Sequence, residues 1–217
     1  MNEIYSNEKY LIINEILNAI THAIATILSM VGLIILLVKA ILAEDPIQLV
    51  SYTIYGSSML TLFLSSTLYH SLIFTGASKI LRIFDHSSIF IFIAGSYTPY
   101  CLLSIKGVTG WVFLVLIWLI AAMGILYKCL MLNKCHFVSK ISSIVYIAMG
   151  WLCIFASHSL YHSLGLNGFC LLVAGGLTYT TGTFFYNLEK IKFMHVVWHV
   201  FVMLGAIFIF FSILNHT

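Results

Sequence analysis

Long apolar runs separated by short polar connections dominate the chain. A helix that is apolar on every side carries little periodic signal, so run length and interrupting charges place the elements. The runs cover residues 16–38, 49–73, 84–104, 109–128, 139–159, 165–187 and 194–214. Each holds about 20 residues, the length a helix needs to cross about 30 Å of hydrocarbon. The pattern predicts an all-α bundle of seven transmembrane helices, forming a single domain over residues 1–217.

The positive charges between these runs predict the orientation of the bundle. Short cytoplasmic connections of membrane proteins carry an excess of lysine and arginine. One predicted side of the membrane carries Lys9, Lys79, Arg82, Lys128, Lys134, Lys140, Lys190 and Lys192, whereas the other carries Lys39 and Lys106. We therefore expect the amino terminus in the cytoplasm and the carboxyl terminus outside.

The composition agrees with this class and excludes others. The chain is 61% hydrophobic and 8% charged, and its mean hydropathy is +1.06, far from the values of soluble domains. A net charge of +3 without a basic stripe gives no indication of nucleic-acid binding. The five cysteines are odd in number and contain no C-x-x-C pair, so we expect no disulfide framework.

Polar side chains gather at the predicted cytoplasmic ends of four helices. Ionisable residues at membrane depth are costly, usually face the interior of a bundle, and mark functional sites. In the predicted orientation the residues at this level are Glu15, Asn18, His22, Ser66, His70, Asp85, His195 and His199.

Three histidines in this group suggest a metal site. His195 and His199 are four residues apart, so their imidazoles leave the same face of a helix. With His70 they supply three nitrogens, the usual number at a catalytic zinc whose fourth position holds water. Imidazole ligands suit zinc, which we therefore expect as the cofactor. The alternative is that these histidines only form hydrogen bonds between helices.

Asp85 and Ser66 are the candidate catalytic residues. Asp85 could be a fourth ligand, a hydrogen-bond partner of a ligand, or the base that takes a proton from water on the metal, and we favour the base. It could instead be an interfacial carboxylate paired with Arg82 or Lys79. Ser66 lies one helical turn deeper than His70 and could hold a carbonyl or oxyanion near the metal.

Two further polar groups allow both a functional and a structural interpretation. Glu15, Asn18 and His22 could form a second row of residues that supports the metal ligands, or they could simply begin the first helix. His158 and His162 repeat the four-residue spacing, but at the opposite end of the bundle and without an acidic residue nearby. We interpret that pair as interfacial.

Five sequence blocks resemble the signature of the hemolysin III family, the bacterial branch related to the progestin and adipoQ receptors. They are Glu15-x-x-Asn18-x-x-Thr21-His22, Ser65-Ser66-Thr67-Leu68-Tyr69-His70, Asp85-His86-Ser87-Ser88-Ile89, Gly95-Ser96-Tyr97-Thr98-Pro99 and His195-x-x-x-His199. The resemblance implies a seven-helix protein of the bacterial inner (cell) membrane. It also implies zinc on His70, His195 and His199, water between the metal and Asp85, and Ser66 close by.

Two functions of different classes follow. Relatives point to a ceramidase-like zinc hydrolase that cleaves a lipid amide or ester with water on the metal and accepts the acyl chain in an apolar cavity. The alternative is a non-enzymatic protein, either a pore-forming haemolysin or a receptor or sensor with a structural zinc. A water-filled pore needs polar positions along whole helices, whereas here they gather at one end. That distribution favours a site over a channel.

Overall fold

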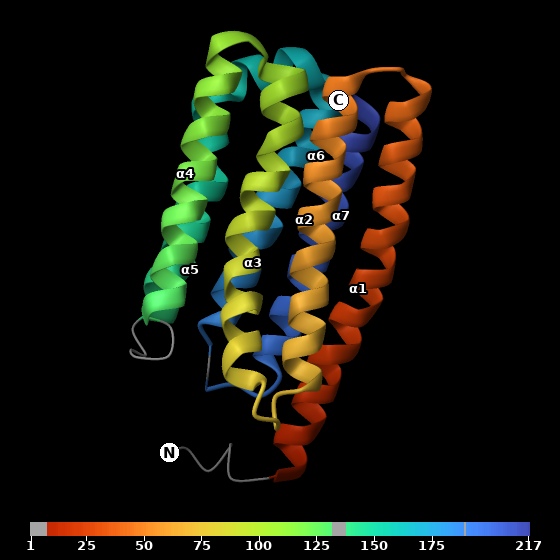
Figure 1. Cartoon of the computed structure of the whole chain (residues 1–217). Helices are drawn as coiled ribbons and strands as arrows, with labels where there is room; N and C mark the ends of the chain where they lie inside the picture. Colours follow the sequence, from red (N-terminus) through yellow and green to blue (C-terminus); the bar gives the residue numbers. More distant parts are fainter. Residues whose placement is uncertain (1–7, 132–137, 189) are drawn as a thin grey trace.

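The computed structural model describes residues 8–131, 138–188 and 190–217, and within these ranges the chain is almost entirely helical. The elements are α1 (Glu8–Leu42), α2 (Pro46–Ser71), α3 (Ser78–Pro99), the π-helix η2 (Tyr100–Ile105), α4 (Gly107–Met131), α5 (Val138–Gly150), the 3-10 helix η3 (Trp151–Ala156), α6 (Ser157–Tyr186) and α7 (Met194–His216). The long axes of the helices run roughly together, so the molecule is one elongated bundle (Figure 1).

Six helical stretches in the described ranges are long and apolar enough to cross a membrane. Five match the expected runs with ends that differ by a few residues; α1 begins at Glu8 rather than near residue 16, and α2 ends at Ser71 rather than at residue 73. The sixth is Ile141–Tyr186, which joins the two runs expected at 139–159 and 165–187. It is interrupted inside α6 at Gly165, whose φ of 66° and ψ of 179° are not helical.

Local sequence explains where several helices begin and end. Asp45 caps α2 by accepting hydrogen bonds from the backbone amides of Ile47 (2.8 Å) and Gln48 (3.1 Å), and Pro46 occupies the first helical position, where its missing amide hydrogen has no cost. Pro99 closes α3, because proline cannot donate the hydrogen bond that would continue a regular α-helix. The chain then continues as the π-helix η2.

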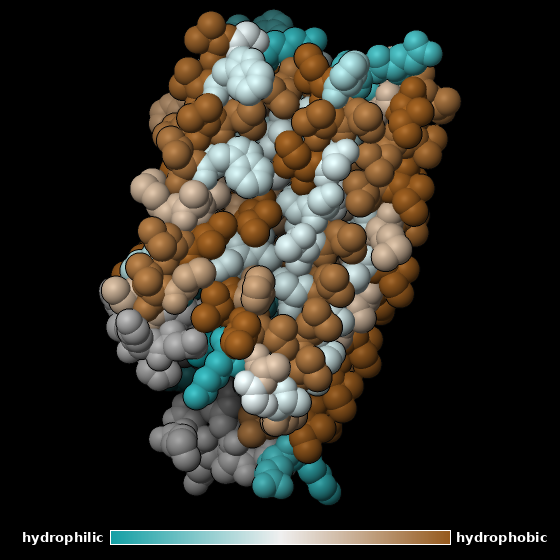
Figure 2. All heavy atoms as spheres, viewed as in Figure 1, coloured by the Kyte–Doolittle hydropathy of each residue, from teal (hydrophilic) through white to brown (hydrophobic). Residues whose placement is uncertain are grey.

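The outer surface is suited to lipid. Large apolar side chains remain exposed along α1 and α4, including Ile27, Ile34, Val115, Leu119 and Met123. Figure 2 shows hydrophobic residues over most of the visible face, with strongly hydrophilic side chains mainly toward its two ends. Contiguous apolar surface of this extent would be a liability in water and is expected in a bilayer.

Small residues let the helices approach closely in the interior. A Cβ atom at Gly205 of α7 would lie 2.5 Å from the Tyr179 ring of α6, and one at Gly182 would lie 2.7 Å from Cβ of Phe201. Glycine at helix contacts is a usual way for membrane helices to pack, since dispersion contacts replace the hydrophobic effect there. This packing fixes α7, which carries two of the candidate metal ligands, against α6.

Helices α1 and α7 run in the same direction. Near the start of both, the rings of Tyr10 and Phe193 lie 5.1 Å apart. Near the end of both, Nζ of Lys39 donates a 2.6 Å hydrogen bond to the carbonyl oxygen of Leu214. In Figure 1, accordingly, α1 begins at the lower end of the bundle and α7 ends at the upper end.

Candidate metal centre

The three predicted histidines meet at one place. His70 comes from the last turn of α2, and His195 and His199 come from the first turns of α7. Their potential ligand atoms all lie within 4.8 Å of one another, and within the described ranges they form the one such group of three or more metal-ligating side chains. The ring centroids of His195 and His199 are 4.7 Å apart, and that of His70 is 5.2 Å and 4.9 Å from them.

The free nitrogens of this cluster fit a metal ion. Nε2 of His70, of His195 and of His199 is buried, and none of the three has a hydrogen-bond partner. A buried polar atom without a partner costs about 1–3 kcal/mol, so three in one cluster need an explanation. A divalent cation bound by all three would supply it, and neutral imidazole is a common zinc ligand.

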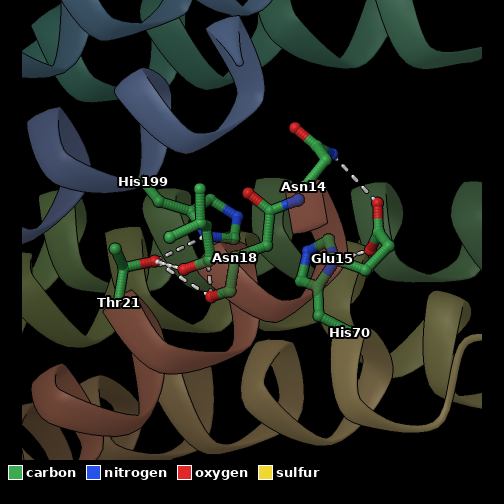
Figure 3. Close-up of polar contacts among 7 residues, drawn as sticks. Asn14, Glu15, Asn18, Thr21, His70 and His199 are labelled. Carbon is green, nitrogen blue, oxygen red and sulfur yellow. Dashed lines mark hydrogen bonds and ion pairs between the residues drawn. The ribbon is translucent and has the colours of Figure 1, made fainter. Parts of the chain in front are cut away.

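Glu15 orients His70 from α1. Oε2 of Glu15 lies 2.6 Å from Nδ1 of His70, and because a carboxylate can only accept, Nδ1 must carry the proton. Asn14 donates a 3.1 Å hydrogen bond to the other carboxylate oxygen. Figure 3 shows this chain of contacts. The contact leaves Nε2 of His70 as the ligating atom, in the manner of the carboxylate–histidine pairs around many metal sites.

His199 is oriented by the same helix through its backbone. Nδ1 of His199 lies 3.3 Å from the carbonyl oxygen of Asn18 and 3.4 Å from Oγ1 of Thr21 (Figure 3). The carbonyl can only accept, so the proton of the imidazole belongs on Nδ1 and Nε2 faces the cluster. The amide side chain of Asn18 is fully buried and has no hydrogen-bond partner. Asn18 thus supports the cluster through its main chain.

His22 supports the cluster by packing. Its ring stacks on that of His199, with centroids 3.6 Å apart and planes 12° from parallel. The His22 ring also meets the ring of Phe63, edge to face, with centroids 5.1 Å apart. His22 is not part of the group of three ligand atoms. The three residues expected in a second row therefore lie beside the histidines, each in a different way.

Asp85 and Ser66 are buried near the cluster. Asp85 is close enough to His70 for an electrostatic interaction, but its oxygens do not belong to the group within 4.8 Å. Oγ of Ser66 is buried without a hydrogen-bond partner. In the described part of the chain, Asp85 forms no ion pair with Arg82 or Lys79, so the interfacial pairing considered from the sequence is not observed.

A cavity of about 200 Å³ extends from this region into the bundle. His22, Asp85 and Trp198 line the end near the cluster, whereas Leu160 and Phe169 belong to the far end. Most of the other lining side chains are apolar. The predicted apolar cavity among the helices is therefore present.

The position of Lys128 differs from the sequence interpretation, whereas the His158 and His162 pair lies at the surface. The sequence pattern places the charge of Lys128 in a connection, but Lys128 lies in the last turn of α4 and is 1% exposed. The His158 and His162 rings lie 4.5 Å apart, but both residues are exposed and belong to no group of three ligands in the described ranges.

Fold and site together define an all-helical, multi-pass protein of the cell membrane with a buried histidine cluster between α2 and α7. The model of the haemolysin-III related family matches residues 10–210. The chain is 44% identical to "Hemolysin-3" of Bacillus cereus over 92% of its length and 90% of the relative's. It is 45% identical to the "Hemolysin-3 homolog" of Bacillus subtilis (strain 168), with 92% of each chain covered.

Similarity extends to animals. The human "Monocyte to macrophage differentiation factor" is 31% identical over 87% of this chain and 78% of its own. The chain belongs to the haemolysin-III related family, as its sequence blocks indicated.

Proposed function

We propose that this protein is a seven-helix, zinc-dependent membrane hydrolase that cleaves an amide or ester bond of a lipid. The observation that carries the proposal is the convergence of three buried, unpartnered Nε2 atoms, from His70, His195 and His199. A structural zinc usually takes all four ligands from the protein. The described cluster offers three, which supports a site with a position left for substrate or water.

The seven-helix arrangement is part of this proposal. A straight helix of the 46 residues from Ile141 to Tyr186 would be about 69 Å long, more than twice the hydrocarbon thickness. The non-helical Gly165 divides it into two segments of membrane-spanning length. Parallel α1 and α7 also require an odd number of crossings. With the predicted orientation, the histidine cluster would lie near the cytoplasmic face.

Each residue near the cluster has a specific role in the proposed reaction. Bound zinc would polarise the carbonyl and make water acidic enough to react at neutral pH. Glu15 holds His70, and the Asn18 carbonyl holds His199, in the tautomers that leave Nε2 available. Asp85 accepts the proton that water loses and passes it to the nitrogen or oxygen of the leaving group as the C–N or C–O bond breaks. Ser66, whose side chain lies beside Asp85, donates a hydrogen bond to the carbonyl oxygen as negative charge develops there.

The cavity supports a lipid as the substrate. Its apolar lining would hold an acyl chain, and its polar end, with Asp85 and His22, lies beside the cluster. A chain seated there would bring its first polar bond to the histidines. An amide or ester at that position is the bond that we expect to be cleaved.

The names of the bacterial relatives, Hemolysin-3 and Hemolysin-3 homolog, raise pore formation as a second function. The described interior opposes it, because buried polar residues farther along the bundle, such as Ser29, Ser58 and Thr98, donate their hydroxyl hydrogen bonds to carbonyl oxygens of their own helices. Between the histidine cluster and the opposite end lies an apolar core that includes Tyr55, Met59, Phe63 and Phe92. A pore in one copy would need a polar path there. Release of a dye from vesicles at protein concentrations that show no hydrolysis would favour the second function.

Metal analysis tests the site. Purified protein should hold about one zinc per chain, and the paired substitution His195→Ala with His199→Ala should remove it. The paired substitution His158→Ala with His162→Ala is the matched control, because it removes the same spacing at an exposed place, and it should leave zinc unchanged. Equal zinc content in the two double variants would refute the assignment.

Turnover is tested separately. Wild-type protein incubated with a panel of N-acyl amides and acyl esters should release free acid, detected by mass spectrometry. Asp85→Asn should keep zinc and lose release of the acid. An Asp85→Asn variant that hydrolyses the panel at the wild-type rate would exclude Asp85 as the base.

A further inference from the structure

The proposed reaction leaves one buried charge unused. Lys128, in the last turn of α4, is 1% exposed. Long lysine side chains near helix ends usually reach toward the aqueous interface, but this one lines the same cavity as Asp85. A buried ammonium in an apolar bundle is costly and marks a functional site more often than a packing contact.

The surroundings of Lys128 form the polar end of the cavity. Its Nζ lies 5.8 Å from the centroid of the Tyr146 ring, a distance at which an aromatic face stabilises a cation. Tyr146 is fixed in turn, because its hydroxyl donates a 2.8 Å hydrogen bond to the backbone oxygen of His86. Lys128, Tyr146 and His86 all line the cavity. The ammonium is therefore presented to the cavity by a rigid support from α3 and α5.

The charge at this end is unbalanced. Lys128 interacts electrostatically with Arg82 and with Asp85. These three side chains carry two positive charges and one negative charge. No ion pair joins Lys128 to Asp85 in the described part of the chain. Glu15, the other carboxylate near the cluster, is engaged by His70. An additional anion at the polar end would be attracted by the surplus positive charge.

We propose that Lys128 binds the anionic headgroup of a single-chain amphiphile whose acyl chain fills the apolar part of the cavity. This deepens the proposed function, and rests on it, by naming the substrate as an anionic acyl lipid, such as an N-acyl amino acid, rather than a neutral one. The charged group could be a carboxylate or a phosphate, since an ammonium binds both as a point charge.

Binding without turnover tests the inference. Palmitate, hexadecyl phosphate and hexadecanol have the same chain length, and only the first two are anionic. Their affinities are measured with the full chain in nanodiscs of neutral lipid, both metal-loaded and after chelation. We expect at least one of the anions to bind about tenfold or more tightly than hexadecanol in both preparations, and the stronger of the two identifies the headgroup.

The variants separate charge from packing. Lys128→Met should remove the preference for the anion but keep the binding of hexadecanol, which also shows that the variant is folded. Lys128→Arg should restore the preference. Lys79→Met, which removes an exposed cation from the start of α3, should bind like wild type.

Three results would overturn the inference. The first is equal affinity of the wild type for all three ligands. The second is a preference for the anion over hexadecanol that is unchanged in Lys128→Met. The third is a preference for the anion that disappears on chelation, because the anion would then bind the metal and not Lys128. The hydrolase proposal can fail independently. A protein that binds the anion through Lys128 but cleaves no amide or ester would retain the headgroup site and lose the proposed reaction.

Discussion

Glu15 and His70 are joined by a 2.6 Å contact between Oε2 and Nδ1, although they lie on different helices and 55 positions apart. The contact makes α1 part of the histidine cluster. Helix α1 contributes no side chain to the group of three ligand atoms, and Glu15 acts on the site by orienting His70. The strength of metal binding should therefore depend on a residue that does not touch the metal.

Substitution of Glu15 should weaken zinc binding. Loss of a carboxylate that orients a ligating histidine typically costs about 10- to 100-fold in metal affinity. We expect Glu15→Ala to fall in that range and Glu15→Gln to lose less, since the amide oxygen can still accept from Nδ1. Competition against a chromophoric chelator measures the change. Glu8→Gln, an exposed acidic residue at the start of α1, is the control, and an unaltered affinity in Glu15→Ala would show that the contact has no role in binding.

The packing role of His22 gives a second prediction. His22 stacks on His199 at 3.6 Å and lies outside the ligand group, so the shape of its ring should matter more than its nitrogens. His22→Phe should keep zinc and stability. His22→Ala should leave a cavity beside His199 and reduce the free energy of unfolding by on the order of 3 kcal/mol. Thermal unfolding and metal analysis of both variants decide the matter, and loss of zinc in His22→Phe would make His22 a ligand after all.

The helical membrane fold and the histidine group could be predicted from the sequence, because they depend on the lengths of the apolar runs and on residue types. Seven apolar runs gave an all-helical membrane protein, and six helical stretches suited to spanning are present in the described ranges. The three histidines were placed together because His195 and His199 share a helix face and the charge pattern set His70 at the same depth. The geometry of His70, His195 and His199 agrees with that reasoning.

The rest depends on contacts that a sequence does not contain. Whether Glu15 or Asn18 would contact a histidine depends on how α1 rotates against α2 and α7, and both lie on an apolar helix with little periodic signal. Asn18 uses its main chain, which no side-chain pattern reveals. The sequence pattern places Lys128 in a connection, because a charge at the end of an apolar run usually marks the interface. Only the packing of Lys128 against Tyr146 shows that it is buried.

Removal of the metal should destabilise the folded protein. A ligand that binds only the folded state stabilises it by about 2.7 kcal/mol when its concentration is 100 times the Kd. Chelation should therefore lower the Tm of wild type, and added zinc should restore it. The His195→Ala and His199→Ala double variant should have a Tm that neither treatment moves. Calorimetry or a thermal-shift assay in detergent measures both, and equal responses of wild type and variant would show that the stabilising metal binds elsewhere.

Lys39 provides the last prediction, at the end of the bundle opposite the histidines. Its Nζ donates hydrogen bonds to the carbonyl oxygen of Leu214 at 2.6 Å and to the hydroxyl of Tyr52 at 3.0 Å. The first satisfies a carbonyl that the last turn of α7 leaves without a helical partner, and a cation there also suits the helix dipole.

Lys39→Met should lower the free energy of unfolding by about 1.5–3 kcal/mol, the usual contribution of a hydrogen bond to a charged group. Zinc content should not change, because an apolar core separates this end from the histidine cluster. Lys39→Arg should recover part of the loss, since guanidinium can donate to the same two oxygens. Denaturant titration in detergent gives the stability, and metal analysis of the same samples gives the zinc. A Lys39→Met protein that keeps its stability would contradict the expected role of the hydrogen bonds. A Lys39→Met protein that loses zinc would show that the two ends of the bundle are coupled.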